Sequence, residues 1–250
     1  MLVAASTECF ASLPLSEALT KIIDLEFADV DIAIHADLSH HVTPADVAED
    51  LDRAVAICRD THRLGIVAYS VKIDAAGEEH YRQFTACCRL AKATKVVTLT
   101  VPSGEKGTPF NEEVEHLRRL VDIASVEGVR VSLHTERGRM ADDASTVGVL
   151  CDNVKGLGIT LDPSHFILGG DRMNMIDPML KYVYHVYLRD TSVDRLQVRV
   201  GQGKIEYGKL INMLKRHGYD RALTIHMLEN EDHDPMGELR KLRLLLESHL

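Results

Sequence analysis

Short apolar runs alternate with longer amphipathic segments along the whole chain. Runs typical of strands begin near Val3, Val30, Ile66, Val96, Arg130, Gly158, His185 and Ala222. Their spacing is roughly the 30 residues that one strand and its helix occupy. Between them, capping residues precede proline at Thr43, Asp177 and Asp234, as at the start of helices. Eight strand–helix pairs predict an α/β protein, specifically a (β/α)8 TIM barrel.

The connections between these elements are unequal in length. Joins from helix to strand are short, such as Gly128 alone, whereas joins from strand to helix are long, at 102–110, 163–171 and 189–206. Barrel enzymes keep their catalytic residues on long segments that follow the carboxyl ends of strands. No Gly-x-Gly-x-x-Gly follows the first strand, so an open dinucleotide-binding sheet lacks its signature. We also expect one long helix from Thr43-Pro44 to Gly65.

Polar side chains occupy every second position of the last four predicted strands. Because side chains alternate across a strand, the apolar set faces the helices and the polar set faces the barrel axis. The inward set is Ser132, His134 and Glu136 on the fifth strand, Thr160 and Asp162 on the sixth, His185, Tyr187 and Arg189 on the seventh, and Thr224 and His226 on the eighth. The first four strands show the pattern less densely, with Ser6, Glu8, Asp31, His35, Ser70, Lys72, Thr98 and Thr100.

Several of these inward residues are candidates for metal ligands. Polar groups inside a barrel carry a desolvation cost unless they pair or bind water or a ligand. A single inward histidine is more often structural than catalytic, but four strands direct a larger set toward one rim: His134, Glu136, Asp162, His185 and His226. Imidazole nitrogens and carboxylate oxygens without thiolates suit a divalent ion such as Zn²⁺, Mn²⁺ or Mg²⁺. The pattern therefore predicts a metal site among these residues.

Further polar residues are candidates for contacts with a substrate. Lys72 and Arg189 could anchor an anionic or polyhydroxy substrate, or could form a salt bridge at the rim. Gln202 lies between two glycines in the loop after the seventh strand, where backbone N–H groups could bind phosphate or make a simple turn. The candidate substrate-binding set is His35, Lys72, His185, Tyr187, Arg189 and Gln202. Four other histidines are predicted to lie on the solvent-exposed surface: His40, His41, His233 and His249.

Composition narrows the class of protein. A length of 250 residues fits one domain over 1–250, and the formal charge of −9 without a basic run disfavours a nucleic-acid partner. Five cysteines without a Cys-x-x-Cys indicate a reducing compartment. The chain begins without a basic, apolar leader, and no apolar run reaches the ~20 residues of a membrane span. We expect a cytoplasmic protein with a small-molecule substrate and no membrane partner, and a homo-oligomer stays open.

Four stretches resemble one family: GVRVSLHTE, GITLDPSH, YHVYLRDT and VGQGKIEYGKLINMLKRHGYDRALTI. Their order and spacing resemble the xylose isomerase-like barrels known as sugar phosphate isomerases/epimerases, which include ketose 3-epimerases, inosose dehydratases and, more distantly, endonuclease IV. The resemblance covers essentially the whole chain and is strongest over 128–229.

The resemblance implies a metal held by Glu, Asp, His and Glu on the fifth to eighth strands, with the glutamates moving a proton beside a carbonyl. Asp162 matches this set, and His165 matches the histidine that follows. His134, Tyr187 and His226 stand where Glu, His and Glu are expected. Glu136, two residues beyond His134, could supply a carboxylate, and His185 could be a deeper ligand.

These observations predict a metal-dependent isomerase or epimerase of a small carbohydrate or hydroxyketone. A metal at His134, Asp162 and His226 would polarise the carbonyl, and Glu136 or His165 would move the proton through an enediolate. The alternatives are a dehydratase of a cyclic polyol ketone and a barrel that has lost its metal and only binds sugar. A phosphodiesterase of the endonuclease IV type is less favoured, because those proteins have a fuller set of metal ligands and a basic face for DNA.

Overall fold

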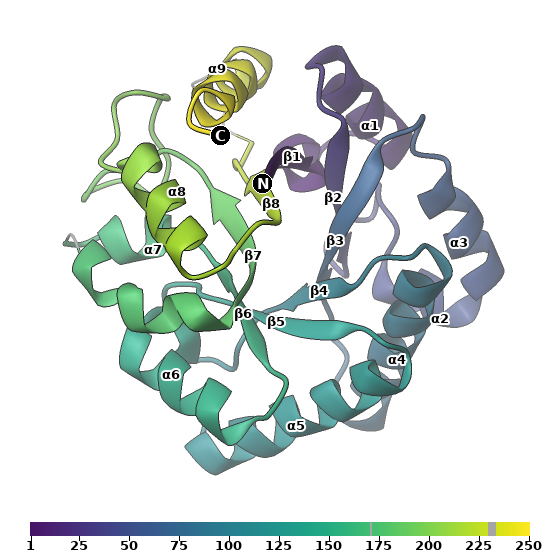
Figure 1. Cartoon of the computed structure of the whole chain (residues 1–250). Coiled ribbons are helices and arrows are strands. Elements are labelled where there is room, and N and C mark those ends of the chain that lie inside the picture. The colour runs from purple at the N-terminus through teal and green to yellow at the C-terminus, as the bar shows by residue number, and fades with distance from the viewer. Residues whose placement is uncertain (171, 230–233) are drawn as a thin grey trace.

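The computed structural model describes residues 1–170, 172–229 and 234–250. Within these residues, eight parallel strands close into a barrel in the order β1 to β8, and helices surround it (Figure 1). The strands are β1 (Leu2–Ser6), β2 (Asp29–His35), β3 (Gly65–Lys72), β4 (Thr98–Val101), β5 (Arg130–His134), β6 (Gly158–Leu161), β7 (Val183–Leu188) and β8 (Ala222–Ile225). The predicted TIM barrel is confirmed, and each strand begins within two residues of its predicted start.

The helices of the described residues follow the strands. They are α1 (Leu15–Asp24), α2 (Pro44–Glu49), α3 (Leu51–Arg59), α4 (Gly77–Ala93), α5 (Phe110–Val126), α6 (Ala144–Asn153), α7 (Ser164–Ile167), α8 (Tyr207–Arg216) and α9 (Pro235–Glu247). Short 3-10 turns are η1 (Thr7–Phe10), η2 (Met140–Asp142), η3 (Met173–Met175) and η4 (Asp177–Tyr182). In the described residues, no helix is both long and apolar enough to cross a membrane.

One expected helix is divided in two. Thr43 and Asp46 form a capping box at the start of α2, as the Thr-Pro pair predicts. The prediction of one long helix to Gly65 is wrong, because α2 ends at Glu49 and α3 begins at Leu51. The carboxylate of Asp50 accepts a hydrogen bond from the Arg53 N–H at 3.0 Å, so this residue caps a new helix instead of continuing the old one.

The barrel interior is polar and paired. Apolar strand residues such as Leu133, Ile159 and Val186 are buried against the helices. On the inner side, the Thr160 hydroxyl lies 2.7 Å from the hydroxyls of both Thr100 and Ser132. Since these hydroxyls satisfy one another, the middle of the barrel needs no ligand there, and the chemistry is left to the carboxyl ends of the strands.

The long loop after β7 is held by one buried carboxylate. Asp190 Oδ2 accepts hydrogen bonds from the N–H groups of Gly201 at 2.7 Å and Gly203 at 3.0 Å. Its Oδ1 accepts from the Thr191 N–H at 3.1 Å. The two glycine N–H groups that could have bound phosphate are therefore occupied by the protein itself, and Gln202 between them is exposed.

We predict that Gly203→Ala destabilises the protein by roughly 2 kcal/mol. A Cβ at this position would lie 1.8 Å from Asp190 Oδ1 and 2.7 Å from the Thr191 nitrogen, so the loop must shift. Gly148→Ala in α6 is the matched control, because its Cβ would meet nothing within 4 Å. Urea unfolding of both variants measures the difference, and equal midpoints would contradict the proposed anchor.

Candidate functional site at the barrel mouth

Asp162 lies at the centre of the polar group at the end of β6. Its side chain is fully buried, and Oδ1 accepts hydrogen bonds from the Ser164 N–H at 3.0 Å and from the Ser164 hydroxyl. Oδ2 accepts from Nη2 of Arg189 at 2.7 Å. Burial by itself would raise the pKa of this carboxyl, but the Arg189 charge, with His165 and His134, holds it well below its usual range. Asp162 is therefore an ionised carboxylate.

Arg189, directly after β7, bridges Asp162 to His226. The same Nη2 atom lies 2.6 Å from His226 Nδ1, and the Arg189 side chain is 2% exposed. A guanidinium nitrogen can only donate, so His226 Nδ1 must be the unprotonated acceptor. Arg189 Nε is buried and has no hydrogen-bond partner among the described residues.

Glu8 accepts a hydrogen bond from the second ring nitrogen of His226. His226 Nε2 donates to Glu8 Oε2, so this histidine is neutral and both of its ring nitrogens are engaged. Burial and the Arg189 charge lower the pKa of His226, in agreement with that state. Glu8 Oε1 also contacts His35 Nδ1 at 2.9 Å and Lys72 Nζ at 3.5 Å. Burial would raise the pKa of Glu8, but His226 and His35 hold it well below its usual range.

His134 and His165 flank the other side of Asp162. Their Nε2 atoms lie 3.6 and 3.5 Å from Asp162 Oδ2. His165 Nδ1 accepts the backbone N–H of Arg137 at 3.1 Å, so the neutral ring carries its proton on Nε2. Burial lowers the pKa of His165 to about 4, which keeps the ring neutral near pH 7. Among the described residues, no atom bonds the buried Nε2 of His134.

A metal ion has possible ligands here. One ligand atom each from His134, Asp162 and His165 lies within 4.8 Å of the others. However, His165 presents a proton and not a lone pair, and the charged Arg189 already donates to Asp162 Oδ2. Catalytic zinc sites usually have three protein ligands. In this arrangement His165 offers no lone pair and the Asp162 carboxylate faces a guanidinium, so these residues do not fit a divalent ion.

Tyr187 and His185 lie deeper in the barrel. The Tyr187 hydroxyl donates to Asp31 Oδ2 at 3.2 Å, and His185 Nε2 lies 3.1 Å from the same oxygen. The Tyr187 ring stacks on His226, with 4.3 Å between ring centroids. Both residues are buried and hold contacts within the protein, and Tyr187 positions the His226 ring by stacking on it.

The other predicted residues are more scattered. The Glu136 side chain is 30% exposed and pairs with Arg139 at 3.1 Å, outside the group around Asp162. Lys72 reaches Glu8 from the rim. His40 and His249 are exposed as predicted, and His233 lies outside the described residues. The expectation that His41 is exposed is wrong, because it packs against η1, 3.5 Å from the Thr7 hydroxyl, and is 7% exposed.

Glu8 and Asp31 are the residues that sequence reasoning did not select. Both lie on the predicted inward face, which was the available signal. Neither has a partner nearby in the chain: Glu8 contacts His226, 218 residues away, and Asp31 contacts Tyr187, 156 residues away. Their importance is therefore visible only once the barrel closes.

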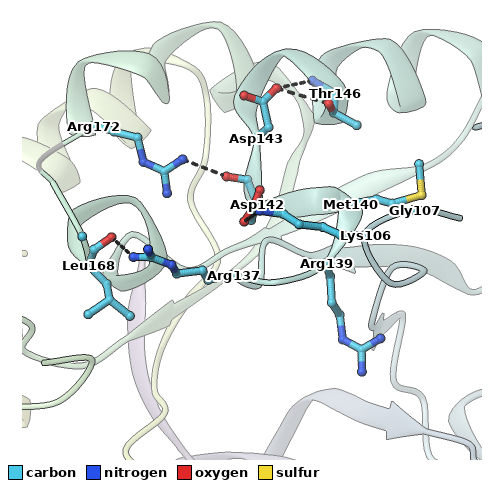
Figure 2. Close-up of a pocket in the computed structure, with 11 residues that line it drawn as sticks. Lys106, Gly107, Arg137, Arg139, Met140, Asp142, Asp143, Thr146, Leu168 and Arg172 are labelled. Atoms are coloured by element: carbon cyan, nitrogen blue, oxygen red, sulfur yellow. Dashed lines mark hydrogen bonds and ion pairs between the residues drawn. The ribbon is translucent and has the colours of Figure 1, made fainter.

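A basic cavity of about 640 Å³ adjoins this group. Figure 2 shows Arg137 beside Leu168, Arg172 and Lys106 directed toward Asp142, and Arg139 pointing away from them. Four cationic side chains line the cavity, against two carboxylates: Lys106, Arg137, Arg139 and Arg172, with Asp142 and Asp143. Arg172 Nη2 donates to the His165 carbonyl at 3.0 Å, so the cavity shares its wall with the turn that carries His165. No carboxylate of the described residues pairs with Arg137 or Arg172.

The profile of the xylose isomerase-like TIM barrel matches residues 19–248. The chain therefore belongs to this family. An uncharacterized protein of Methanocaldococcus jannaschii, MJ1311, is 25% identical over 118 residues, which are 44% of this chain and 40% of that protein. The chain thus matches less than half of the length of this relative.

Known structures share the fold over nearly the whole chain. A D-tagatose 3-epimerase-like protein is 17% identical with a TM-score of 0.74, covering 99% of both chains. The probable 3-DHS dehydratase AsbF from Bacillus anthracis is 15% identical with a TM-score of 0.75, covering 99% of both. A xylose isomerase-like TIM barrel protein from Mycobacterium smegmatis, in complex with magnesium, is 14% identical with a TM-score of 0.78, covering 100% of this chain and 98% of that one.

We predict that the protein loses stability as the pH falls from about 6.5 to about 4, and that His165→Asn makes this loss smaller. The folded pKa of His165 lies below its unfolded value of about 6.5, so in that window the unfolded chain binds a proton that the folded chain does not. The His165 part amounts to roughly 3 kcal/mol. Urea unfolding across this pH range checks it, with exposed His249→Asn as the control; identical pH profiles for His165→Asn and wild type would refute it.

Proposed function

We propose that this protein is an isomerase or epimerase of a small carbohydrate or carbohydrate-like hydroxyketone. The observation that carries the proposal is the buried group of Asp162, Arg189 and three histidines, His134, His165 and His226, at the carboxyl end of the barrel. Membership of the xylose isomerase-like family and the shared fold with an epimerase-like protein support it. A cytoplasmic location and a homo-oligomer remain predictions.

The reaction moves one proton beside a carbonyl. A base removes the proton from the carbon next to the carbonyl, and the electron pair moves onto the carbonyl oxygen to give an enediolate. Return of the proton to the same carbon from the other face gives an epimer. Return to the former carbonyl carbon, while the hydroxyl proton passes to the other oxygen, gives an isomer. We assign the base to His134, whose Nε2 has no described hydrogen-bond partner and can accept the proton when the ring carries its own proton on Nδ1. The neutral His165 ring can donate a hydrogen bond from Nε2 to the carbonyl oxygen, whereas the Glu136 carboxylate is paired with Arg139.

A metal-dependent form of this reaction would place Zn²⁺, Mn²⁺ or Mg²⁺ at Asp162 with His134 and either His165 or His226. The magnesium complex of the related M. smegmatis barrel supports that form. Arg189 already donates a hydrogen bond to His226 Nδ1 and forms an ion pair with the Asp162 carboxylate. We therefore assign the proton transfer to the histidines without a metal.

A dehydratase is the second candidate, because the AsbF dehydratase shares the fold over 99% of both chains. It would form an enolate by the same proton removal and then expel the hydroxyl group of the next carbon, which leaves as water with the proton that the base has taken up. The third candidate is not an enzyme but a barrel that binds sugar without catalysing a reaction.

We predict that wild-type protein exchanges the proton beside the carbonyl of at least one ketose with solvent deuterium, measured by NMR over a panel of ketoses and cyclic polyol ketones. His134→Gln should slow the exchange by roughly 100-fold or more, the usual contribution of a general base. His40→Gln, an exposed histidine, is the matched control. Binding without exchange would favour the sugar-binding barrel, release of water would favour the dehydratase, and neither binding nor exchange would end the proposal.

The basic cavity favours a substrate with an anionic group. We predict that Arg172→Met raises the KM for a phosphorylated or acidic sugar roughly tenfold, the loss of one hydrogen bond between charged groups. The KM for the neutral analogue should stay unchanged. Arg118→Met, which removes an exposed arginine paired with Glu115, is the control. Equal changes in KM for both sugars would show that the cavity does not bind the anionic group.

A further inference from the structure

We propose that the guanidinium of Arg189 occupies the place of a divalent ion at the barrel mouth and supplies its positive charge. The sequence pattern predicts that His134, Asp162 and His226 hold such an ion. In the structure, two of these three residues direct their lone pairs at a single atom, Arg189 Nη2.

Arg189 Nη2 lies between two of the three predicted ligands. It is 2.7 Å from Asp162 Oδ2 and 2.6 Å from His226 Nδ1, and His134 Nε2 lies 3.6 Å from the same Asp162 oxygen. An ion bound to both Asp162 Oδ2 and His226 Nδ1 would have to lie where this nitrogen is. Because His226 Nε2 donates to Glu8, the histidine has no second lone pair to offer.

Charge and packing hold Arg189 in this position. The guanidinium is always protonated, and moving it away would leave a buried carboxylate without its partner. The backbone on both sides is fixed: the His226 N–H donates to the Leu188 carbonyl at 2.9 Å, and Asp190 anchors the following loop through Gly201 and Gly203. The side chain is 2% exposed, so water cannot replace the contacts it would lose.

The same guanidinium can serve the substrate. Arg189 Nε is buried with no partner among the described residues, so its N–H is a donor of this guanidinium that the protein itself does not use. A carbonyl oxygen that becomes an enediolate oxygen gains negative charge, and a fixed N–H on a buried cation stabilises that charge. This part of the inference depends on the proposed isomerase chemistry, whereas the exclusion of metal does not.

The test measures metal content and thermal stability of the full chain with Zn²⁺, Mn²⁺ or Mg²⁺ alone. Wild type should emerge from incubation and gel filtration without stoichiometric metal, and neither metal nor chelator should shift its Tm. Arg189→Met should lower the Tm by roughly 10 °C, because Asp162 loses its counterion. It should also gain about one Zn²⁺ per chain, since three donors suffice for a zinc site and His226 Nδ1, Asp162 Oδ2 and His134 Nε2 are now free. Arg118→Met is the matched control and should behave as wild type.

Each outcome decides the inference separately from the function. A stoichiometric ion in wild type that disappears in Asp162→Asn overturns it, and so does folded Arg189→Met that takes up no ion. The wild-type measurement decides the matter by itself where Arg189→Met does not fold. Metal-free protein that exchanges no substrate proton would refute the isomerase proposal and leave the exclusion of metal in place.

Discussion

The buried ion pair between Asp162 and Arg189 is the contact on which the barrel mouth depends. Removing two charges from water costs several kcal/mol for each, so such a pair persists only where other hydrogen bonds complete it. Here Ser164 completes the carboxylate, and His226 takes a second bond from the guanidinium. From His226 the contacts continue to Glu8 and then to His35 and Lys72. One polar network thus joins the ends of β6, β7 and β8 to those of β1, β2 and β3.

This network fixes the protonation of its members. Arg189 makes His226 an acceptor at Nδ1, and the Arg137 N–H does the same to His165. Two carboxylates, Glu8 and Asp162, have lowered pKa values while His165 is neutral, all within one small volume. Environments that separate charged from neutral groups in this way suit proton transfer beside a preorganised charge. Around Asp162, the buried atoms His134 Nε2 and Arg189 Nε have no hydrogen-bond partner among the described residues.

Much of the fold follows from local pattern. Strand starts were predicted within two residues because apolar and polar side chains must alternate where a strand has helices on one side and a barrel axis on the other. The same alternation identified Asp162, Arg189 and His226 as inward residues, and all three are buried. The prediction of one helix between Thr43 and Gly65 was wrong, since helical periodicity does not show that Asp50 prefers to cap.

The sequence by itself determined that this is a barrel and which side chains face its axis, because both follow from periodicity within each strand. Tertiary structure alone decided which of those side chains pair. Glu8 meets His226 because closure of the barrel places β8 beside β1, and the N–H groups of Gly201 and Gly203 are taken by Asp190 because the loop folds back on it. The guanidinium of Arg189 lies between Asp162 and His226 for the same reason: its partners come from neighbouring strands, and no spacing along one strand encodes them.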